Sequence, residues 1–321
     1  MKRVSLWAVL IAVLVVGLAA GAAGAEEFVI GFSNASRGNA WAAQYAQRVY
    51  DLLDALPNVT HMYADGEDDG VKQLSDVEDM LARGMDLLII RPSTPEILAV
   101  VVEQVYDLGI PVVVSGRNVA TDKFTSFVWV DDVDLGRRTA QAAVDMLVEK
   151  YGEPRGKVAI IQGLMAAGSA RARDQGTMEI LDQYPGIEIV ARQPGEYRRA
   201  DARTVMENIL MAQPEIDVLI THAGEMAVGA IEAMKAAGRR GEFPVTSVDG
   251  NNGFLKAIAA GDGHFTALYP LALGDLTVDV AMRILAGEEV EKIIAMDVPN
   301  VTPENIHEFV RLDQPDTYFT Y

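Results

Sequence analysis

The chain has 321 residues, a formal net charge of −19 and no cysteine. The acidic balance makes nucleic acid a poor candidate for a partner, because binding to its phosphates requires a surplus of Lys and Arg. The absence of cysteine excludes disulfides, thiol catalysis and Cys-ligated zinc or iron–sulfur centres. An apolar core must therefore supply the stability of the fold.

Residues 1–25 have the three parts of a secretory signal peptide. Lys2 and Arg3 give a positive start, LWAVLIAVLVVGLAA forms an apolar core, and AGA at 23–25 supplies the small residues of a cleavage site. Cleavage after Ala25 predicts a soluble periplasmic protein. The alternative is an uncleaved membrane anchor, because the apolar run is nearly long enough to span a bilayer.

In the first half of the chain, short β-branched runs alternate with longer stretches of helical periodicity. Strands are predicted at 28–32, 59–63, 86–90, 110–114 and 127–130, and helices at 40–56, 71–83 and 95–108. The strand runs are nearly all apolar, as expected of parallel strands that are covered by helices on both faces.

The same alternation then begins again. Strands are predicted at 157–161, 187–191, 217–221, 243–248 and 264–270, and helices at 169–183, 200–212, 225–236, 252–260 and 273–286. Two consecutive sets of β–α units predict an α/β protein with two similar Rossmann-like lobes, each built on a parallel sheet. Ligands of such sheets bind beyond the carboxyl ends of the strands, so the segments that follow the strands are the candidate site.

Six segments, in order along the chain, resemble periplasmic sugar-binding proteins of the ribose-binding type, which serve ATP-binding-cassette (ABC) importers. They are IGFSNASRGNAW, DLLIIRPST, GIPVVVSGR, IIQGLMAAGSARARDQG, GEMAVGAIEAMKAAG and VTSVDGN. The resemblance covers nearly all of residues 27–310, and the spacing of Ser33 and Trp41 is most similar to the galactofuranose-binding subgroup.

This resemblance implies the periplasmic binding protein type I fold, whose chain crosses between the lobes three times. By that pattern the N-terminal lobe takes 26–130 and 270–297, and the C-terminal lobe takes 131–269 and 298–321. The hinges are expected at 131–132 and 269–270. Closure of the lobes would trap the ligand between them.

The resemblance also implies what the protein does. We expect it to capture a small carbohydrate, either a pentose, a hexose or a polyol, and to deliver it to the permease of an ABC importer. A chemoreceptor is a further candidate partner, and a monomer is expected. An enzyme is disfavoured, because the sequence has no recognisable nucleophile–base or metal constellation.

Ten residues at or near predicted strand ends are candidate ligand contacts. The resemblance implies a ligand carboxylate at Asp249, ligand arginines at Arg117 and Arg173, and a stacking ring at Tyr197, with Trp41 as a second ring. The alternatives are a helix cap for Asp249, a surface position for Arg173, and core packing for the two aromatic residues. The full set is Ser33, Arg37, Trp41, Arg91, Arg117, Asp131, Arg173, Tyr197, His222 and Asp249.

Three positions depart from the ribose-binding pattern. Gly116, Ala223 and Leu268 stand where ribose binders have Asp, Asn and Gln. The loss of three polar contacts predicts a ligand other than ribose. His222 and Glu225 flank one of these positions and are candidates to replace the lost Asn.

Four of the ten candidates are arginines. Either the ligand is at least partly anionic, or two of the arginines pair with Asp131, Asp132 or Asp249. The sequence leaves both readings open.

The segment DGEDDGVKQLSD at 65–76 resembles a calcium-binding EF-hand loop. Asp65, Glu67 and Asp69 fall at ligand positions, but Asp76 stands where the bidentate Glu is usual, so a solvated acidic loop is the alternative. No Walker loop, HExxH or G-x-S-x-G motif is present, and neither a resident metal nor a cofactor is expected.

Overall fold

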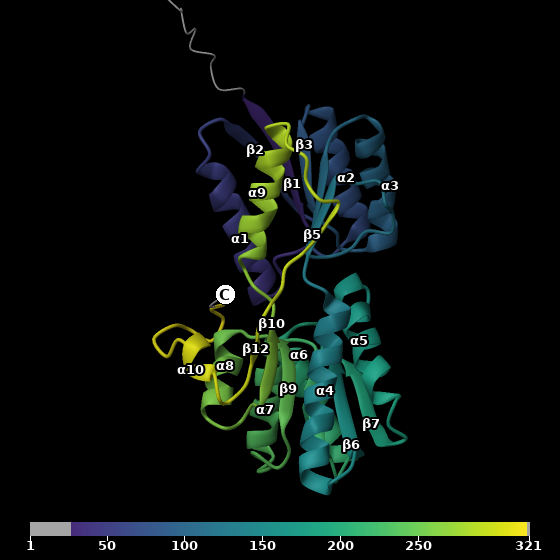
Figure 1. Ribbon diagram of the computed structural model, residues 1–321, viewed down its shortest axis with the longest axis vertical. Coiled ribbons are helices and arrows are strands. Elements are labelled where there is room, and N and C mark those ends of the chain that lie inside the picture. Colours follow the sequence, from purple (N-terminus) through teal and green to yellow (C-terminus); the bar gives the residue numbers. More distant parts are fainter. Residues whose placement is uncertain (1–26, 320–321) are drawn as a thin grey trace, which may run out of the picture.

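The computed structural model describes residues 27–319, so the predicted signal peptide lies outside the described residues. Within this range the chain forms two six-stranded sheets, each covered by helices and stacked along the long axis of the molecule (Figure 1). The predicted pair of α/β lobes is thereby confirmed. None of the helices in this range is both long enough and apolar enough to cross a membrane.

The first lobe is built on a fully parallel sheet with the strand order β11-β5-β4-β3-β1-β2. Helices α1 and α9 cover one face of this sheet, and α2 and α3 cover the other. The strands are β1 (Phe28–Asn34), β2 (Val59–Asp65), β3 (Leu87–Arg91), β4 (Val112–Ser115), β5 (Ser126–Trp129) and β11 (Ile293–Ala295). The helices are α1 (Ala40–Asp54), α2 (Gly70–Ala82), α3 (Pro95–Asp107) and α9 (Leu273–Leu285).

The second lobe repeats this plan with the order β12-β10-β9-β8-β6-β7, in which the edge strand β12 is antiparallel to β10. Helices α4 and α5 cover one face, and α6, α7 and α8 cover the other. The strands are β6 (Arg155–Gln162), β7 (Gly186–Pro194), β8 (Val218–Thr221), β9 (Val245–Asp249), β10 (Phe265–Leu268) and β12 (Asn300–Val301). The helices are α4 (Asp132–Tyr151), α5 (Gly168–Leu181), α6 (Arg199–Ala212), α7 (Gly224–Ala236), α8 (Asn252–Ala259) and the short α10 (Ile306–Phe309).

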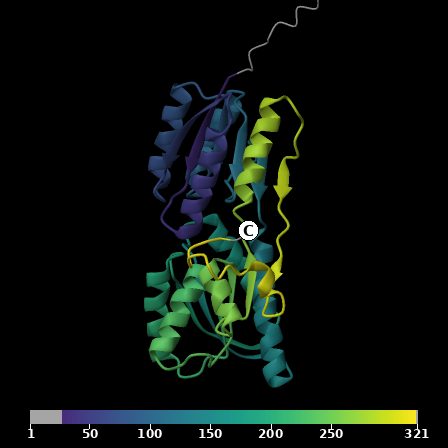
Figure 2. The same ribbon diagram turned by 90° about the vertical axis from the view of Figure 1, so that its left-hand side faces the viewer.

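Over residues 27–319 the chain passes between the two sheets three times. The crossings lie between β5 and α4, between β10 and α9, and between β11 and β12 (Figure 2). All three run through the same narrow region, where one cluster of buried apolar residues extends from the first lobe to Leu135, Val248 and Phe265 of the second.

Helix α4 is an element that the sequence analysis did not predict. Its buried face consists largely of small or polar residues, including Gly136, Thr139, Ala140 and Ala143. It lacks the stripe of large apolar side chains by which an amphipathic helix is recognised in a sequence.

The small residues of α4 allow its backbone to approach that of α5. A Cβ atom on Gly136 would overlap the carbonyl oxygen of Arg173, and a Cβ on Gly176 would overlap the carbonyl oxygen of Val133. Only glycine permits this approach. The contact fixes α5, and with it Arg173, against α4.

We predict that Gly176→Ala destabilises the protein by about 2 kcal/mol, because the added methyl meets a backbone oxygen that no side-chain rotation can move. This clash outweighs the gain in helix propensity that alanine normally brings. Urea unfolding provides the measurement, and Gln175→Ala, on the exposed side of the same turn, is the control. Equal stability of the two variants would contradict the proposed backbone contact.

A buried histidine follows β8. His222 is 1% exposed, and its Nδ1 accepts a hydrogen bond from the backbone nitrogen of Gly163 at 3.4 Å. Burial, and to a lesser degree the charges of Arg173 and Arg192, lower its pKa to about 3, although Asp174 acts in the opposite direction. The imidazole is therefore neutral in the folded protein at neutral pH.

Because an unfolded histidine takes up a proton near pH 6.5, this pKa makes stability depend on pH. The contribution of neutral His222 to the free energy of unfolding is fully present above pH 6.5 and is lost as the pH falls toward 3. Between pH 7.5 and pH 5.0, His222 should account for a loss of about 2 kcal/mol in the free energy of unfolding. His222→Asn, which keeps an acceptor, should remove this part of the pH dependence, whereas His307→Asn at an exposed site should not. Identical pH profiles for both variants would refute the prediction.

A candidate ligand site between the lobes

A cavity lies between the two lobes, at the carboxyl ends of strands from both sheets. It has about 450 Å³ of empty space, part of which is open to solvent. Both lobes contribute to it, as the rule for open parallel sheets predicts. It is lined by Asn39, Trp41, Arg91, Arg117, Ser169, Arg173, Tyr197, Ala223, Glu225, Asp249, Tyr269 and Phe319.

Six of the ten candidate residues line this cavity, and the other four lie elsewhere. The six are Trp41, Arg91, Arg117, Arg173, Tyr197 and Asp249. Of the others, Ser33 is buried at the end of β1, where its hydroxyl accepts a hydrogen bond from Gln73 at 3.1 Å. Arg37 is exposed and donates to the side chain of Gln47 at 3.2 Å.

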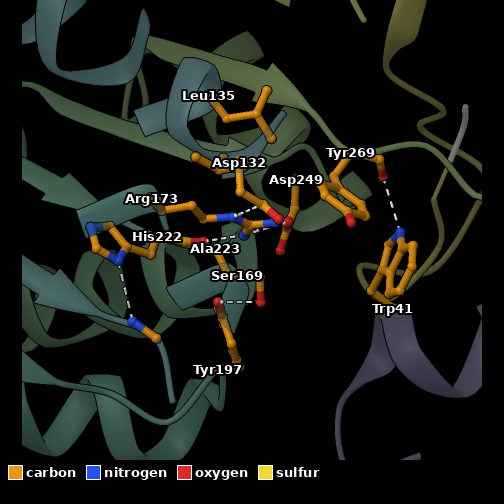
Figure 3. A network of polar contacts seen from close by, with 12 residues as sticks. Trp41, Asp132, Leu135, Ser169, Arg173, Tyr197, His222, Ala223, Asp249 and Tyr269 are labelled. Atoms are coloured by element: carbon orange, nitrogen blue, oxygen red, sulfur yellow. Dashed lines mark hydrogen bonds and ion pairs between the residues drawn. The ribbon is translucent and has the colours of Figure 1, made fainter. Parts of the chain in front are cut away.

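Asp131 and His222 lie next to the cavity but do not line it. The carboxylate of Asp131 caps the N-terminus of α4, accepting from the backbone nitrogens of Val133 and Asp134. The imidazole of His222 points away from the cavity toward Gly163, while its carbonyl oxygen accepts a hydrogen bond from Arg173 (Figure 3).

Arg173 is the centre of a buried ion cluster on the second lobe. Its Nε donates to Asp132 at 2.7 Å, and its Nη1 donates to Asp249 at 3.0 Å and to the carbonyl of His222 at 2.5 Å (Figure 3). Burial opposes the charge of Arg173, but the two carboxylates prevail and raise its pKa well above the ordinary value. The cluster therefore stays charged and joins α4, α5, β8 and β9.

Burial raises the pKa of both carboxylates in this cluster. Burial raises the pKa of Asp132 to about 6, against the opposing influence of Arg173. Burial likewise raises the pKa of Asp249. Asp249 faces the cavity, where its oxygens are available to accept hydrogen bonds from a ligand.

Aromatic rings form two walls of the cavity. The Trp41 ring packs edge-on against Tyr269, with centroids 4.9 Å apart, and its Nε1 donates to the Tyr269 carbonyl at 3.0 Å (Figure 3). On the second lobe, the hydroxyls of Tyr197 and Ser169 are 3.3 Å apart. Each ring presents an apolar surface next to hydrogen-bonding groups, which is the combination that a sugar ring requires.

Backbone strain is concentrated at this site. Tyr197 and Asp249 have positive φ angles of 58° and 88°, a region that residues other than glycine rarely adopt. Asp68, which pairs with the cavity residue Arg117, has a φ of 58°. Strained residues persist where the surrounding structure holds a functional geometry, and here they aim a ring and a carboxylate into one cavity.

The arginines do not pair as the second sequence-based reading proposed. Arg173 alone takes both Asp132 and Asp249, whereas Asp131 caps a helix. One arginine, not two, is compensated by these carboxylates. That prediction was wrong because a sequence does not reveal that one guanidinium, that of Arg173, pairs with both Asp132 and Asp249.

Several lining residues were missed or given another role. Asn39 is the N-cap of α1 and Ser169 lies in the first turn of α5, so the strand-end rule could have found both. Tyr269 was predicted only as a hinge. Phe319 lies in the C-terminal segment, which pairs with Asn251 at the start of α8, and no local sequence signal indicates its position.

The acidic loop at 65–76 uses its carboxylates for local structure. Asp69 caps α2, accepting from the backbone nitrogens of Val71 and Lys72. Asp76 pairs with Lys72 at 2.9 Å. Among residues 27–319, no group of three or more His, Asp or Glu side chains is placed to hold a metal ion.

Comparisons with known proteins agree with this architecture. The ribose import binding protein of Bacillus subtilis is 31% identical over 271 residues, which cover 84% of this chain and 86% of that protein. A solute-binding protein of an ABC transporter from Bacillus halodurans, solved with bound myo-inositol, is 26% identical with a TM-score of 0.82, covering 88% of this chain and 97% of the other.

A third similar protein comes from a signalling system. It is the fructose-binding periplasmic domain of a hybrid two-component system, which is 27% identical with a TM-score of 0.80 and covers 88% of this chain and 93% of that one. The family model described as "periplasmic binding protein domain" matches residues 30–289. With its two parallel-sheet lobes and a cavity between them, this chain belongs to the periplasmic binding protein family.

Proposed function

We propose that this protein is an exported substrate-binding component of an ABC importer, which captures a small carbohydrate or polyol between its lobes and has no catalytic role. The observation that carries the proposal is the cavity in which Asp249 and Arg173 lie beside the rings of Trp41 and Tyr197. Two relatives support the same class of ligand, since one is a ribose import binding protein and the other is a solute-binding protein solved with bound myo-inositol.

The chemistry of the cavity fits a polyhydroxylated ligand. Each hydroxyl of such a ligand both donates and accepts hydrogen bonds, so a site needs acceptors and donors together. Asp249 supplies carboxylate acceptors, and the arginines supply only donors. Trp41 and Tyr197 provide apolar surfaces for the C–H faces of the ligand.

The partner and the cellular location follow from this role. The signal peptide at 1–25 would export the chain to the periplasm, where a monomer would dock on an importer permease. A second role as a ligand-presenting sensor is supported by the similarity to the fructose-binding domain of a two-component system. In both roles the partner reads whether the lobes are closed.

Closure of the lobes is part of the proposal. The three crossing segments are the hinge, with the N-terminal lobe comprising 26–130 and 270–297 and the C-terminal lobe the remainder after the signal. Contacts across the cleft favour the closed arrangement. Arg171 of α5 pairs with Glu96 of α3 at 3.1 Å, and Gln44 of α1 donates to the carbonyl of Thr317.

Substitution of the cavity carboxylate tests the function directly. Asp249→Asn should weaken carbohydrate binding by about 10- to 100-fold, because it removes a charged acceptor while Asn tolerates the positive φ. Calorimetry and thermal shift against a panel of pentoses, hexoses and polyols would measure this effect. The exposed Asp313→Asn is the control, and an unchanged affinity of Asp249→Asn would remove this carboxylate from the site.

Small-angle X-ray scattering tests the closure. We expect saturating ligand to reduce the radius of gyration of the wild-type protein, since ligand contacts both lobes and so favours their approach. Glu96→Gln should shift the ligand-free population toward the open form and reduce affinity by at most about fivefold, because the Glu96–Arg171 pair is exposed. Identical scattering with and without ligand would rule out hinge closure as the response to binding.

A further inference from the structure

The wall that the first lobe contributes contains two buried arginines whose donors are largely unused. Arg91 and Arg117 are only 6% and 3% exposed, and both line the cavity. Among residues 27–319, Nε and Nη1 of Arg91 and Nε of Arg117 have no hydrogen-bond partner. The Arg117 guanidinium has one ion pair in this range, with Asp68 at 3.4 Å.

The two cations also act on each other. Burial, followed by the charge of Arg117, lowers the pKa of Arg91 to about 10. This arginine is held in place by its surroundings rather than by a counter-ion. Its guanidinium lies 5.1 Å from the Trp41 ring centroid, and its carbonyl accepts a hydrogen bond from Gln73 at 2.9 Å.

The opposite wall shows what a compensated arginine looks like in this protein. Arg173 is similarly buried, at 4% exposed, but it has two carboxylates and a carbonyl as partners. A buried guanidinium without such partners is destabilising, because both its charge and its donors have lost water. On the wall of the first lobe, Asp68 pairs with Arg117, but among residues 27–319 Arg91 has no negatively charged acceptor.

The position that could supply this charge has no side chain. Gly116 precedes Arg117, and a Cβ atom there would lie 3.6 Å from Nε of Arg91. An acidic residue at 116 would place its carboxylate beside Arg91. Glycine instead leaves the charge of Arg91 without a carboxylate partner among residues 27–319.

We propose that the ligand is a sugar acid whose single carboxylate is held by Arg91 and Arg117, while its hydroxyls reach Asp249. This wall carries two positive charges, on Arg91 and Arg117, and one negative charge, on Asp68. The carboxylate of the ligand would neutralise the remaining positive charge. This inference rests on the proposed carbohydrate-binding function and specifies the chemical class of its ligand. Two arginines suit the planar carboxylate because each guanidinium offers paired donors.

Calorimetry at pH 7.5 with matched pairs of ligands tests the inference. The probes are D-galactose with D-galacturonate, D-glucose with D-gluconate, D-ribose with D-ribonate, and the phosphate esters glucose 6-phosphate and ribose 5-phosphate. We expect one sugar acid to bind about 100-fold more tightly than its neutral counterpart, in keeping with the strength of charge-assisted hydrogen bonds.

The possible outcomes separate the two proposals. If a neutral sugar binds as tightly as its acid, the inference fails and the proposed carbohydrate function stands. If a phosphate ester binds more tightly than every sugar acid, the carboxylate assignment fails. If no member of either class binds, the inference fails, and the carbohydrate-binding function fails with it when the panel of pentoses, hexoses and polyols also gives no binding.

A matched pair of variants tests the physical cause. Gly116→Asp should reduce the preference for acid over neutral sugar by at least about tenfold, because its carboxylate takes the place of the ligand's. Gly116→Asn has nearly the same size and similar tolerance for the φ of +69°, but carries no charge, so it should keep most of that preference.

The acid-to-neutral ratio is measured within each variant, so a general loss of stability cannot imitate the effect. Thermal unfolding of both variants verifies that they fold. Equal ratios for Gly116→Asp and Gly116→Asn would overturn the assignment of an uncompensated charge at Arg91.

Discussion

The site depends on one constraint, the requirement of buried Arg173 for negatively charged acceptors. Its partners come from separate elements: Asp132 at the start of α4, the His222 carbonyl after β8, and Asp249 at the end of β9. A buried arginine destabilises the fold unless acceptors on several sides take hydrogen bonds from its guanidinium. The ion cluster thus fixes the edge of the second sheet. Because Asp249 is one of the partners of Arg173, the same contacts also hold its carboxylate at the cavity.

The two walls of the cavity are electrostatically unlike each other. On the second lobe the charges are paired before any ligand arrives, so that wall is preorganised. On the first lobe, Arg91 and Arg117 retain donors that have no hydrogen-bond partner among the described residues. A ligand can accept hydrogen bonds from those donors on the first lobe and contact Asp249 on the second lobe at the same time only when the two lobes are close. Such a difference in interaction between open and closed states is what allows binding to drive closure.

Much of this architecture could be read from patterns along the chain. Nearly continuous apolar runs predicted buried parallel strands, and the strand-end rule located six of the ten candidate residues on the cavity. The same rule placed Ser33 and Arg37 in the right loop, but it does not decide which way a side chain points. Helix α4 was not predicted, because it packs against α5 through small residues. It therefore lacks the stripe of large apolar side chains by which a helix is recognised in a sequence.

The sequence by itself determined the class of fold, the two lobes and the segments that approach the ligand, since burial and periodicity are local properties of a chain. Only the tertiary structure decided which charges are compensated. Arg173 meets Asp249 across 76 positions of sequence, and Phe319 reaches the cavity from the far end of the described chain. Within the part of the chain that the structure describes, Arg91 meets no such partner. Pairing of charges depends on distances of a few ångströms between remote residues, and the folded arrangement of the two sheets sets those distances.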